Sequence, residues 1–472
     1  MSRRGATIAA LACALAGAAP LSAMAETLSN ALTRAYHANP ALNSGRAGLR
    51  ADDENVPRAL SQFRPRVKTD AFLGVERRRS VSNAYEIDNG DIFDPKYVQS
   101  FQNNRSLPRS AVLSVEQPLF DGFKTRNSAL AAETGVFASR ERLRLTEQRV
   151  LFDAVAAYMN VLRDTAALRL QESNVAVLDE QLRQNKERYA AGQITLTDIA
   201  QSEARLQAGR SQVAAARATL EASLGRYKQL IGDEPRRLAP ADPVDRLLPK
   251  TRSDAERVAQ SEHPVILAAL HDVDAADLDI RVIESDFMPR LSMVGNVYTQ
   301  SDIDGRGNRA VGAQVLGKLS VPIYAGGETS ARVRQAKELA GQKKFDVDVA
   351  RAELLALVRA NWGALQAAKA QIAAAQSQIE AAERALNGVR EEAKAGQRTT
   401  LEILNAQQEL LNARIGLVFA QRDRVVASYA VLASIGRLSA RDLRLPVTDY
   451  DPSLHFDQVK DSWGGTQTPG GR

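Results

Sequence analysis

The sequence predicts an α+β fold that occurs twice in one chain, with pairs of strands followed by long antiparallel helical hairpins. The first observation is a duplication: residues 118–232 align with residues 322–436 at a constant spacing of 204, without insertion or deletion. The second is a change of hydrophobic period, because each copy passes from an alternation of two residues to a helical pattern. The third is length, since both helical stretches run for many turns without proline.

The duplication is clearest in three short motifs. Gln117–Gly122 aligns with Val321–Gly326, Ala191–Gln193 with Ala395–Gln397, and Leu230–Gly232 with Ser434–Gly436. Upstream, Pro65 aligns with Pro289 at a spacing of 224, so the first copy holds 20 extra residues between about Glu76 and Pro108. Such an insertion is tolerated at an exposed loop tip, so we expect a polar surface loop from Arg77 to Leu107.

These alignments divide the chain into a leader, two repeats and a tail. The leader is 1–25, the first repeat 26–249, the second repeat 250–445 and the tail 446–472. The first repeat holds a strand pair within 65–120 and a helical hairpin at 123–232, and the second holds the same elements at 289–322 and 327–436. The tail is polar, and we expect it to be flexible without clear structure.

The leader has the composition of a secretory signal peptide. Arg3 and Arg4 precede an apolar run from Ala6 to Ala19, and Ala23 and Ala25 supply the small residues of a cleavage site. The run is too short to span a membrane, which takes about 20 residues. The chain's single cysteine, Cys13, lies in this run, so acylation there is the alternative. Cleavage after Ala25 predicts an exported chain without cysteine.

Composition argues against nucleic-acid binding and against catalysis. The net charge of +6 is small and evenly spread, which gives no basic surface for a nucleic acid. The four histidines, His37, His263, His271 and His455, have no metal-binding spacing. The sequence also lacks a Ser-His-Asp or phosphate-loop signature. We therefore expect no enzyme, no cofactor and no metal site.

Each repeat begins with helices and continues with strands. One helix is predicted to end before Pro40 and the next to begin there, because proline suits the first turn of a helix. After Pro65 and Pro289 apolar and polar residues alternate, which predicts two strands in each copy. The predicted apolar face consists of Val67, Thr69, Ala71, Leu73, Val75, Ala111, Leu113, Val115, Leu291, Met293, Val297, Ala313, Val315, Leu319 and Val321.

The four strands have the length and the alternation of strands that cross a membrane in a β-barrel. Four strands cannot close a barrel, because about eight are needed, and an open sheet edge is not tolerated in lipid. If the strands cross a lipid bilayer, several chains must share one barrel, and three chains would supply 12 strands. The alternative is a pair of amphipathic hairpins on a soluble core.

Two very long helices follow the strands. About 66 residues before Gly192 would reach roughly 100 Å as one helix. Heptad stripes mark them as coiled coils: Leu365, Ile372, Ile379 and Leu386, with Ala368, Ala375, Ala382 and Val389, and in the first copy Leu151, Val155, Tyr158, Leu162, Val175, Leu178, Leu182 and Tyr189. Gly192 and Gly396 are predicted to end these helices.

A returning helix is predicted after each glycine. Thr195 with Asp198, and Thr399 with Glu402, have the spacing of a capping box. Both acids therefore have a structural explanation, in addition to any part in function.

These features together resemble the TolC family of outer-membrane channel-tunnel proteins, over nearly all of residues 26–445. The resemblance rests on the duplicated plan, on the turns at Gln117–Gly122 and Val321–Gly327, and on Ala395–Asn405. It implies a homotrimer with a 12-stranded barrel in the outer membrane and a helical tunnel in the periplasm. It also implies partners, namely a periplasmic adaptor and an inner-membrane ABC or proton-driven exporter, in type I secretion or tripartite efflux.

The resemblance also implies a periplasmic gate at the hairpin turns. Arg398 is expected to pair with Asp198 on a neighbouring hairpin, and Glu402 and position 405 are expected to ring the pore. The family usually has an acid at position 405, where this sequence has Asn405, and often a tyrosine where it has Ala393. The alternative function is a periplasmic coiled-coil adaptor, but the sequence shows no lipoyl-like module. The cargo is not disclosed.

Overall fold

The computed structural model describes residues 25–86, 96–303 and 306–469, and within these the chain forms two compact units. One unit comprises residues up to 43, 146–259 and 356–449, and the other comprises 44–145, 260–355 and the residues from 450. Each unit thus contains parts of both predicted repeats. The predicted leader lies outside the described residues apart from Ala25, so cleavage at Ala23 and Ala25 stays a prediction.

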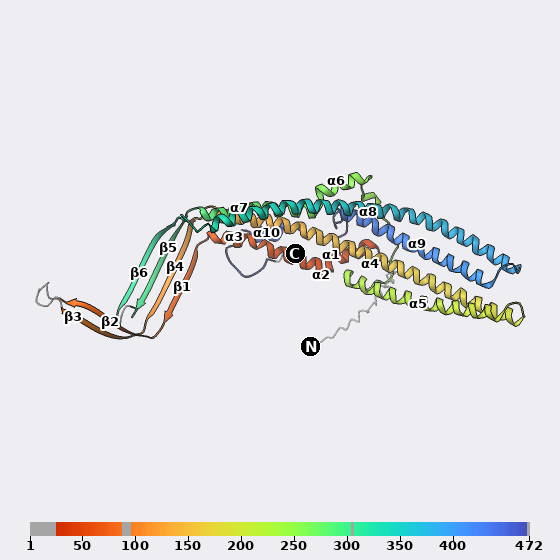
Figure 1. Cartoon of the computed structure of the whole chain (residues 1–472), viewed down its shortest axis with the longest axis horizontal. Coiled ribbons are helices and arrows are strands. Elements are labelled where there is room, and N and C mark those ends of the chain that lie inside the picture. Colours follow the sequence, from red (N-terminus) through yellow and green to blue (C-terminus); the bar gives the residue numbers. More distant parts are fainter. Residues whose placement is uncertain (1–24, 87–95, 304–305, 470–472) are drawn as a thin grey trace, which may run out of the picture. The chain divides into compact units, whose positions relative to one another are not determined.

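A four-stranded antiparallel sheet forms in the second unit (Figure 1). Its strands are β1 (Arg66–Leu73), β4 (Arg109–Phe120), β5 (Arg290–Ser301) and β6 (Arg309–Ser320), in the order β1-β4-β5-β6. All four predicted strands are confirmed. Because β1 and β6 are the edges of the sheet, each leaves one row of backbone groups without a strand partner among the described residues.

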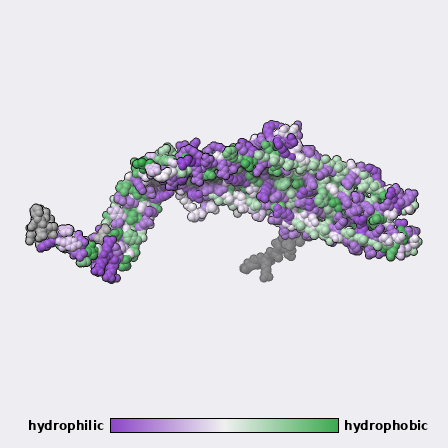
Figure 2. Space-filling view, viewed as in Figure 1, coloured by the Kyte–Doolittle hydropathy of each residue, from purple (hydrophilic) through white to green (hydrophobic). Residues whose placement is uncertain are grey.

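The register places the predicted apolar residues on one face, except Val75 and Val321, which lie beyond the ends of β1 and β6. Val67 lies opposite Val115, and Leu113 lies opposite Val297. Residues directly opposite in an antiparallel pair share a face, so these pairs form continuous apolar rows. Leu113 is 43% exposed and Val315 is 73% exposed in the single chain. Hydrophobic residues are accordingly visible over the strands in the space-filling view (Figure 2).

The polar insertion of the first copy is a correction to the predicted loop. It forms the antiparallel strands β2 (Glu76–Glu86) and β3 (Lys96–Ser106), while residues 87–95 of the predicted loop lie outside the described residues. Val81 lies opposite Phe101, and Tyr85 lies opposite Tyr97, so aromatic and β-branched cross-strand pairs stabilise an otherwise polar hairpin. Too few apolar residues alternate here for the period to be recognised in the sequence.

Short helices and the C-terminal segment pack beside the long helices of this unit. The helices are α2 (Pro40–Asp53), α3 (Asn55–Leu60), η1 (Ser61–Phe63), α7 (Pro264–Glu284), η3 (Ser285–Phe287) and α10 (Ser453–Val459). Helix α2 begins at Pro40, as predicted, and α7 begins at the aligned Pro264. A hydrophobic cluster joins Leu49, Val56, Val136 and Phe456.

The C-terminal tail is the second correction, because part of it is folded. Helix α10 lies within the segment predicted to be flexible, and it buries Phe456 and Val459. His455 is also buried there, and its Nδ1 lies 2.8 Å from Oδ2 of the buried Asp53. Burial raises the pKa of Asp53, and the hydrogen bond with His455 opposes that shift. Only seven residues are helical, so the sequence pattern was too short to reveal the helix.

The two long hairpins are confirmed. The first is α4 (Lys124–Ala190) with α5 (Leu196–Ile231), and the second is α8 (Glu328–Lys394) with α9 (Thr400–Ser434). Helices α4 and α8 have 67 residues each, or roughly 100 Å. The other helices of the first unit are α1 (Leu28–Ala38), α6 (Arg252–Glu262) and η2 (Asp245–Leu247). None of the described helices is both long and apolar enough to cross a membrane.

The predicted heptad stripes form the contacts between helices. In the first unit, Leu178 and Leu182 of α4 pack with Leu206 of α5 and Leu404 of α9. Leu386 of α8 packs with Ile403 and Leu410 of α9, while Ile379, Ala382 and Val389 lie against the same cluster. Tyr189 is the exception, because it is 44% exposed. Leu404 thus connects the hairpin of one repeat with the hairpin of the other.

Candidate functional site

The predicted gate residues lie at the ends of the two helical hairpins, in the first unit. Each long helix ends in a left-handed glycine, Gly192 with φ 71° and Gly396 with φ 78°. The amide of Gln193 donates to the carbonyl of Arg188, and that of Gln397 donates to the carbonyl of Glu392, both at 2.9 Å. These bonds satisfy carbonyls at the helix ends, and a side chain at either glycine would be strained.

A capping box starts each returning helix, as the spacing predicted. The Asp198 amide donates to Thr195 Oγ1 at 3.3 Å, and the Thr195 amide donates to Asp198 Oδ2 at 3.0 Å. In the second hairpin the Glu402 amide donates to Thr399 Oγ1 at 3.4 Å, and the Thr399 amide donates to Glu402 Oε2 at 2.8 Å. Four amide groups at the helix starts are satisfied in this way.

Both capping acids are held ionised. The Thr195 hydroxyl, followed by its backbone amide, lowers the pKa of Asp198. The backbone amide of Thr399, followed by the Arg398 guanidinium, lowers the pKa of Glu402. Hydrogen bonds to a carboxylate favour its charged form, which is the cause in both hairpins. The two acids therefore carry negative charge at neutral pH.

Arg398 makes two ion pairs within its own hairpin. Its Nε lies 2.7 Å from Glu392 Oε2, and its Nη1 lies 2.8 Å from Glu402 Oε1. These carboxylates hold the pKa of Arg398 above its usual range. The Asp198 carboxylate accepts hydrogen bonds from the hydroxyl and the backbone amide of Thr195. The pairing of Arg398 with Asp198 across neighbouring hairpins stays a prediction.

Asn405 has a partner that the sequence did not reveal. Arg205 Nη2 of α5 donates to Asn405 Oδ1 of α9 at 2.8 Å, so the two hairpins of one chain are joined by a polar contact near their ends. A carboxylate at position 405 would form an ion pair with Arg205, whereas the amide accepts the same bond without charge. Arg205 looked like one of many charged residues on a helix surface.

Buried polar residues near the hairpin ends were also missed. Asn185 Nδ2 donates to Ser202 Oγ at 2.7 Å, and both side chains are buried between α4 and α5. Gln407 is 6% exposed, and both its amide atoms are without a hydrogen-bond partner among the described residues. It lines a cavity of about 800 Å³ together with Arg188 of α4 and Arg390 of α8. Polar residues in heptad positions gave no periodic signal.

Known proteins share this architecture. A family model described as outer membrane efflux protein matches residues 31–233 and 257–437. Outer membrane efflux protein BepC of Brucella suis is 40% identical over 95% of this chain and 94% of its own length. Outer membrane protein TolC of Escherichia coli is 24% identical over 91% of this chain and 86% of its own length.

Solved structures give the same result for the fold. The CmeC outer membrane channel of Campylobacter jejuni superposes with a TM-score of 0.71, at 18% identity, over 92% of this chain and 89% of that chain. A membrane protein from Pseudomonas aeruginosa superposes with a TM-score of 0.73, at 18% identity, over 86% of this chain and 90% of that chain. At these identities the likeness shows the fold alone.

Proposed function

Because the chain belongs to the outer membrane efflux protein family, we propose that its two hairpin ends form the periplasmic gate of a trimeric exit duct. The protein is located in the outer membrane and extends into the periplasm. It acts as a homotrimer with a periplasmic adaptor and an inner-membrane exporter, in type I secretion or tripartite efflux. As a channel of this family it is not expected to catalyse a reaction.

One observation supports the gate most directly: the hairpin ends of the two repeats meet within one chain. Arg205 bonds Asn405 at 2.8 Å, and Leu404 packs among Leu178, Leu182 and Leu206. Thr400 on the other hairpin also contributes to lowering the pKa of Asp198. A contact between the hairpins can therefore be altered by a small displacement of either one.

Arg398 is suited to hold such a gate closed. Its guanidinium carries five N–H donors, so it can keep Glu392 and Glu402 while binding a further carboxylate. We infer that this carboxylate is Asp198 on a neighbouring hairpin, with three such contacts closing the trimer. An adaptor or exporter that separates the hairpins would break the contacts and widen the pore.

Single-channel conductance in planar bilayers tests the proposed contact. Asp198→Ala and Arg398→Ser should each raise conductance, because each removes one partner of the pair. The double variant should be less than additive, as expected for a direct interaction.

Thr195→Ala is the matched control. It removes the hydroxyl of the cap, at about 1 kcal/mol, and leaves the Asp198 carboxylate in place. It should therefore leave conductance as in the parent protein. If both Asp198→Ala and Arg398→Ser conduct as the parent protein does, the two residues have no part in the gate. Their roles would then be helix capping and ion pairs within one hairpin.

A further inference from the structure

The C-terminal segment, residues 450–469, is attached to the start of the sheet in the second unit. Its helix α10 packs against α2, α3 and α4 through the hydrophobic cluster that contains Phe456. Further along, Cζ of Arg64 lies 4.8 Å from the centroid of the Trp463 ring, and Arg64 Nη1 donates to the Ser462 carbonyl. Because Arg64 comes two residues before the start of β1, these contacts hold Trp463 beside the end of the sheet that adjoins the helices.

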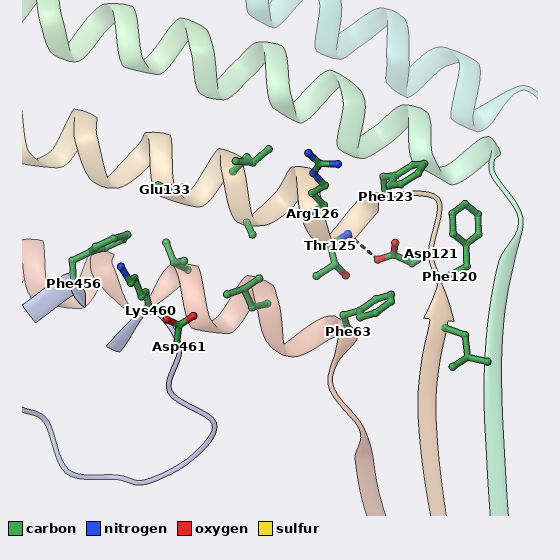
Figure 3. Close-up of a pocket in the computed structure, with 15 residues that line it drawn as sticks. Phe63, Phe120, Asp121, Phe123, Thr125, Arg126, Glu133, Phe456, Lys460 and Asp461 are labelled. Atoms are coloured by element: carbon green, nitrogen blue, oxygen red, sulfur yellow. Dashed lines mark hydrogen bonds between the residues drawn. The ribbon is translucent and has the colours of Figure 1, made fainter. Parts of the chain in front are cut away.

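An apolar pocket of about 620 Å³ opens beside this segment (Figure 3). Phe63, which precedes β1, and Phe123, which follows β4, line it together with Phe456 and Lys460 of the C-terminal segment. Phe63 is 41% exposed, Phe123 is 57% exposed and Trp463 is 73% exposed. Three aromatic side chains with this much exposed area form an apolar surface that requires a partner.

The pocket lies toward the apolar face of the sheet. Leu119 lines it, and this residue ends the apolar row that includes Leu113 and Val115 of β4. A second pocket at the same end of the sheet, of about 400 Å³, is lined by Arg66 and Lys318 of the polar face. Of these two pockets, only the first is lined by residues of the C-terminal segment. The segment is therefore continuous with the face that is expected to contact lipid.

Aromatic side chains are expected at this level of the molecule. The helices extend into the periplasm, so the end of the sheet that adjoins them is the periplasmic end. Membrane barrels carry aromatic residues at both membrane surfaces, and tryptophan and tyrosine are the types enriched there. The three residues at this end of each of the four described strands include no tryptophan or tyrosine. Trp463, held beside the first strand, supplies the missing side chain.

We propose that the C-terminal segment and this pocket bind a phospholipid on the periplasmic side of the outer membrane. Trp463 lies among the headgroups, where its ring meets apolar atoms while its N–H group stays hydrated. The pocket accepts an acyl chain, because its lining continues the apolar row of β4. The inference rests on the proposed function, since it requires the sheet to lie in the membrane.

Tryptophan fluorescence tests the site, because the chain has two tryptophans, Trp362 and Trp463. Purified trimers of the full chain are reconstituted in phosphatidylcholine vesicles with or without bromine on the acyl chains, which quenches a tryptophan in contact with it. Only Trp463 remains in Trp362→Phe, and brominated lipid should remove most of its emission. Bromine near the headgroup should quench it more than bromine near the chain end.

Trp463→Phe is the matched control, because it leaves only Trp362. That residue follows Glu328, the first residue of α8, by 34 residues, or about 50 Å of helix. Brominated lipid should therefore leave the emission of Trp362 unchanged.

Two added reporters are read in a chain that carries both Trp362→Phe and Trp463→Phe. Phe63→Trp sets an indole in the wall of the pocket, and an acyl chain there should quench it. Leu113→Trp sets one on the apolar face, six residues or about 20 Å along β4 from Leu119. It reports whether the sheet lies in lipid, and bromine near the chain end should quench it most.

The reporter at position 113 separates failure of the lipid site from failure of the duct. Quenching of Leu113→Trp without quenching of both Trp463 and Phe63→Trp would overturn the proposed site and leave the sheet in the membrane. A blue-shifted but unquenched Trp463 would then identify a neighbouring subunit as the partner of this surface. Trimers in which none of these three reporters is quenched would place the sheet outside lipid and overturn the proposed function as well.

Discussion

The two hairpin turns at the candidate gate share their backbone but differ in charge. Both have a left-handed glycine and a Thr-x-x-acid capping box. The two repeats therefore end the long helix and begin the returning helix with the same kinds of residue. The second turn alone has Arg398 between two acids, because the first turn has Ile194 at that position and Arg188 in place of Glu392. Features shared by the copies maintain the fold, and features found in one copy are the candidates for function.

The largest effect is expected where the copies agree, on the apolar face of the sheet. Leu113→Arg should destabilise the assembled protein by about 2–4 kcal/mol if the residue lies near the middle of the bilayer, because it sets a charge in lipid. Val315→Arg should have a similar effect in the second copy. Urea titration of unboiled trimers measures the change.

Ser114→Arg and Gln314→Arg are the matched controls for these substitutions. Ser114 is next to Leu113 in the sequence, and Gln314 is next to Val315. Each control residue lies on the opposite face of the sheet from its neighbour, since successive side chains of a strand alternate between the two faces. Equal tolerance of arginine on both faces would contradict the assignment of one face to lipid.

The next effect is expected where the copies differ, at Glu402. Three ionised carboxylates near the pore axis would attract cations, so Glu402→Ala should reduce cation selectivity and block by multivalent cations. Reversal potentials in planar bilayers measure it. Asn405→Asp should increase cation selectivity, because it adds a negative charge. An ion pair between the new carboxylate and Arg205 would reduce this increase. Unchanged selectivity in both variants would place these side chains away from the conduction path.

Much of the fold could be predicted because it depends on long periodic segments. The four strands and both 67-residue helices follow from alternation, heptads and the absence of proline. The missed elements are short or polar. Helix α10 covers Ser453–Val459, and its stability depends on contacts such as Asp53 with His455. A tertiary contact between residues 402 positions apart leaves no local pattern.

The candidate site was predicted unevenly for a related reason. Caps depend on neighbours in sequence, so Thr195 and Thr399 were recognisable from spacing alone. The pair of Arg205 with Asn405 depends on how α5 packs against α9. Likewise, the two ion pairs of Arg398 require a turn that brings Glu392 back toward Glu402. Sequence spacing therefore predicted the residues that cap the helices. It did not predict the contacts that depend on how the helices pack.

A smaller effect is expected from acid. The lowered pKa values of Asp198 and Glu402 mean that both caps contribute stability above the ordinary carboxyl pKa of about 4. That contribution is lost as the pH falls through the lower values of the folded state. Hydrogen exchange, corrected for its intrinsic pH dependence, should show less protection at the starts of α5 and α9 at pH 3 than at pH 7.

The start of α2 is the control for this experiment. The Asn39 side chain caps it by accepting from the amides of Ala41 and Leu42, and no acid lies in the first turn, so its protection should not follow carboxylate titration. Equal loss of protection at all three helix starts would indicate general unfolding in acid.

The smallest effect is expected at the feature that only the first copy has. Strands β2 and β3 form a hairpin whose tip, near Asn89 and Gly90, lies outside the described residues. Extracellular connections are the longer ones in outer-membrane barrels, so we expect this tip at the cell surface. An epitope inserted there should leave trimer yield and conductance unchanged, because hairpin tips tolerate insertion. It should bind antibody on intact cells, and labelling that requires disruption of the outer membrane would mean that the hairpin points into the periplasm.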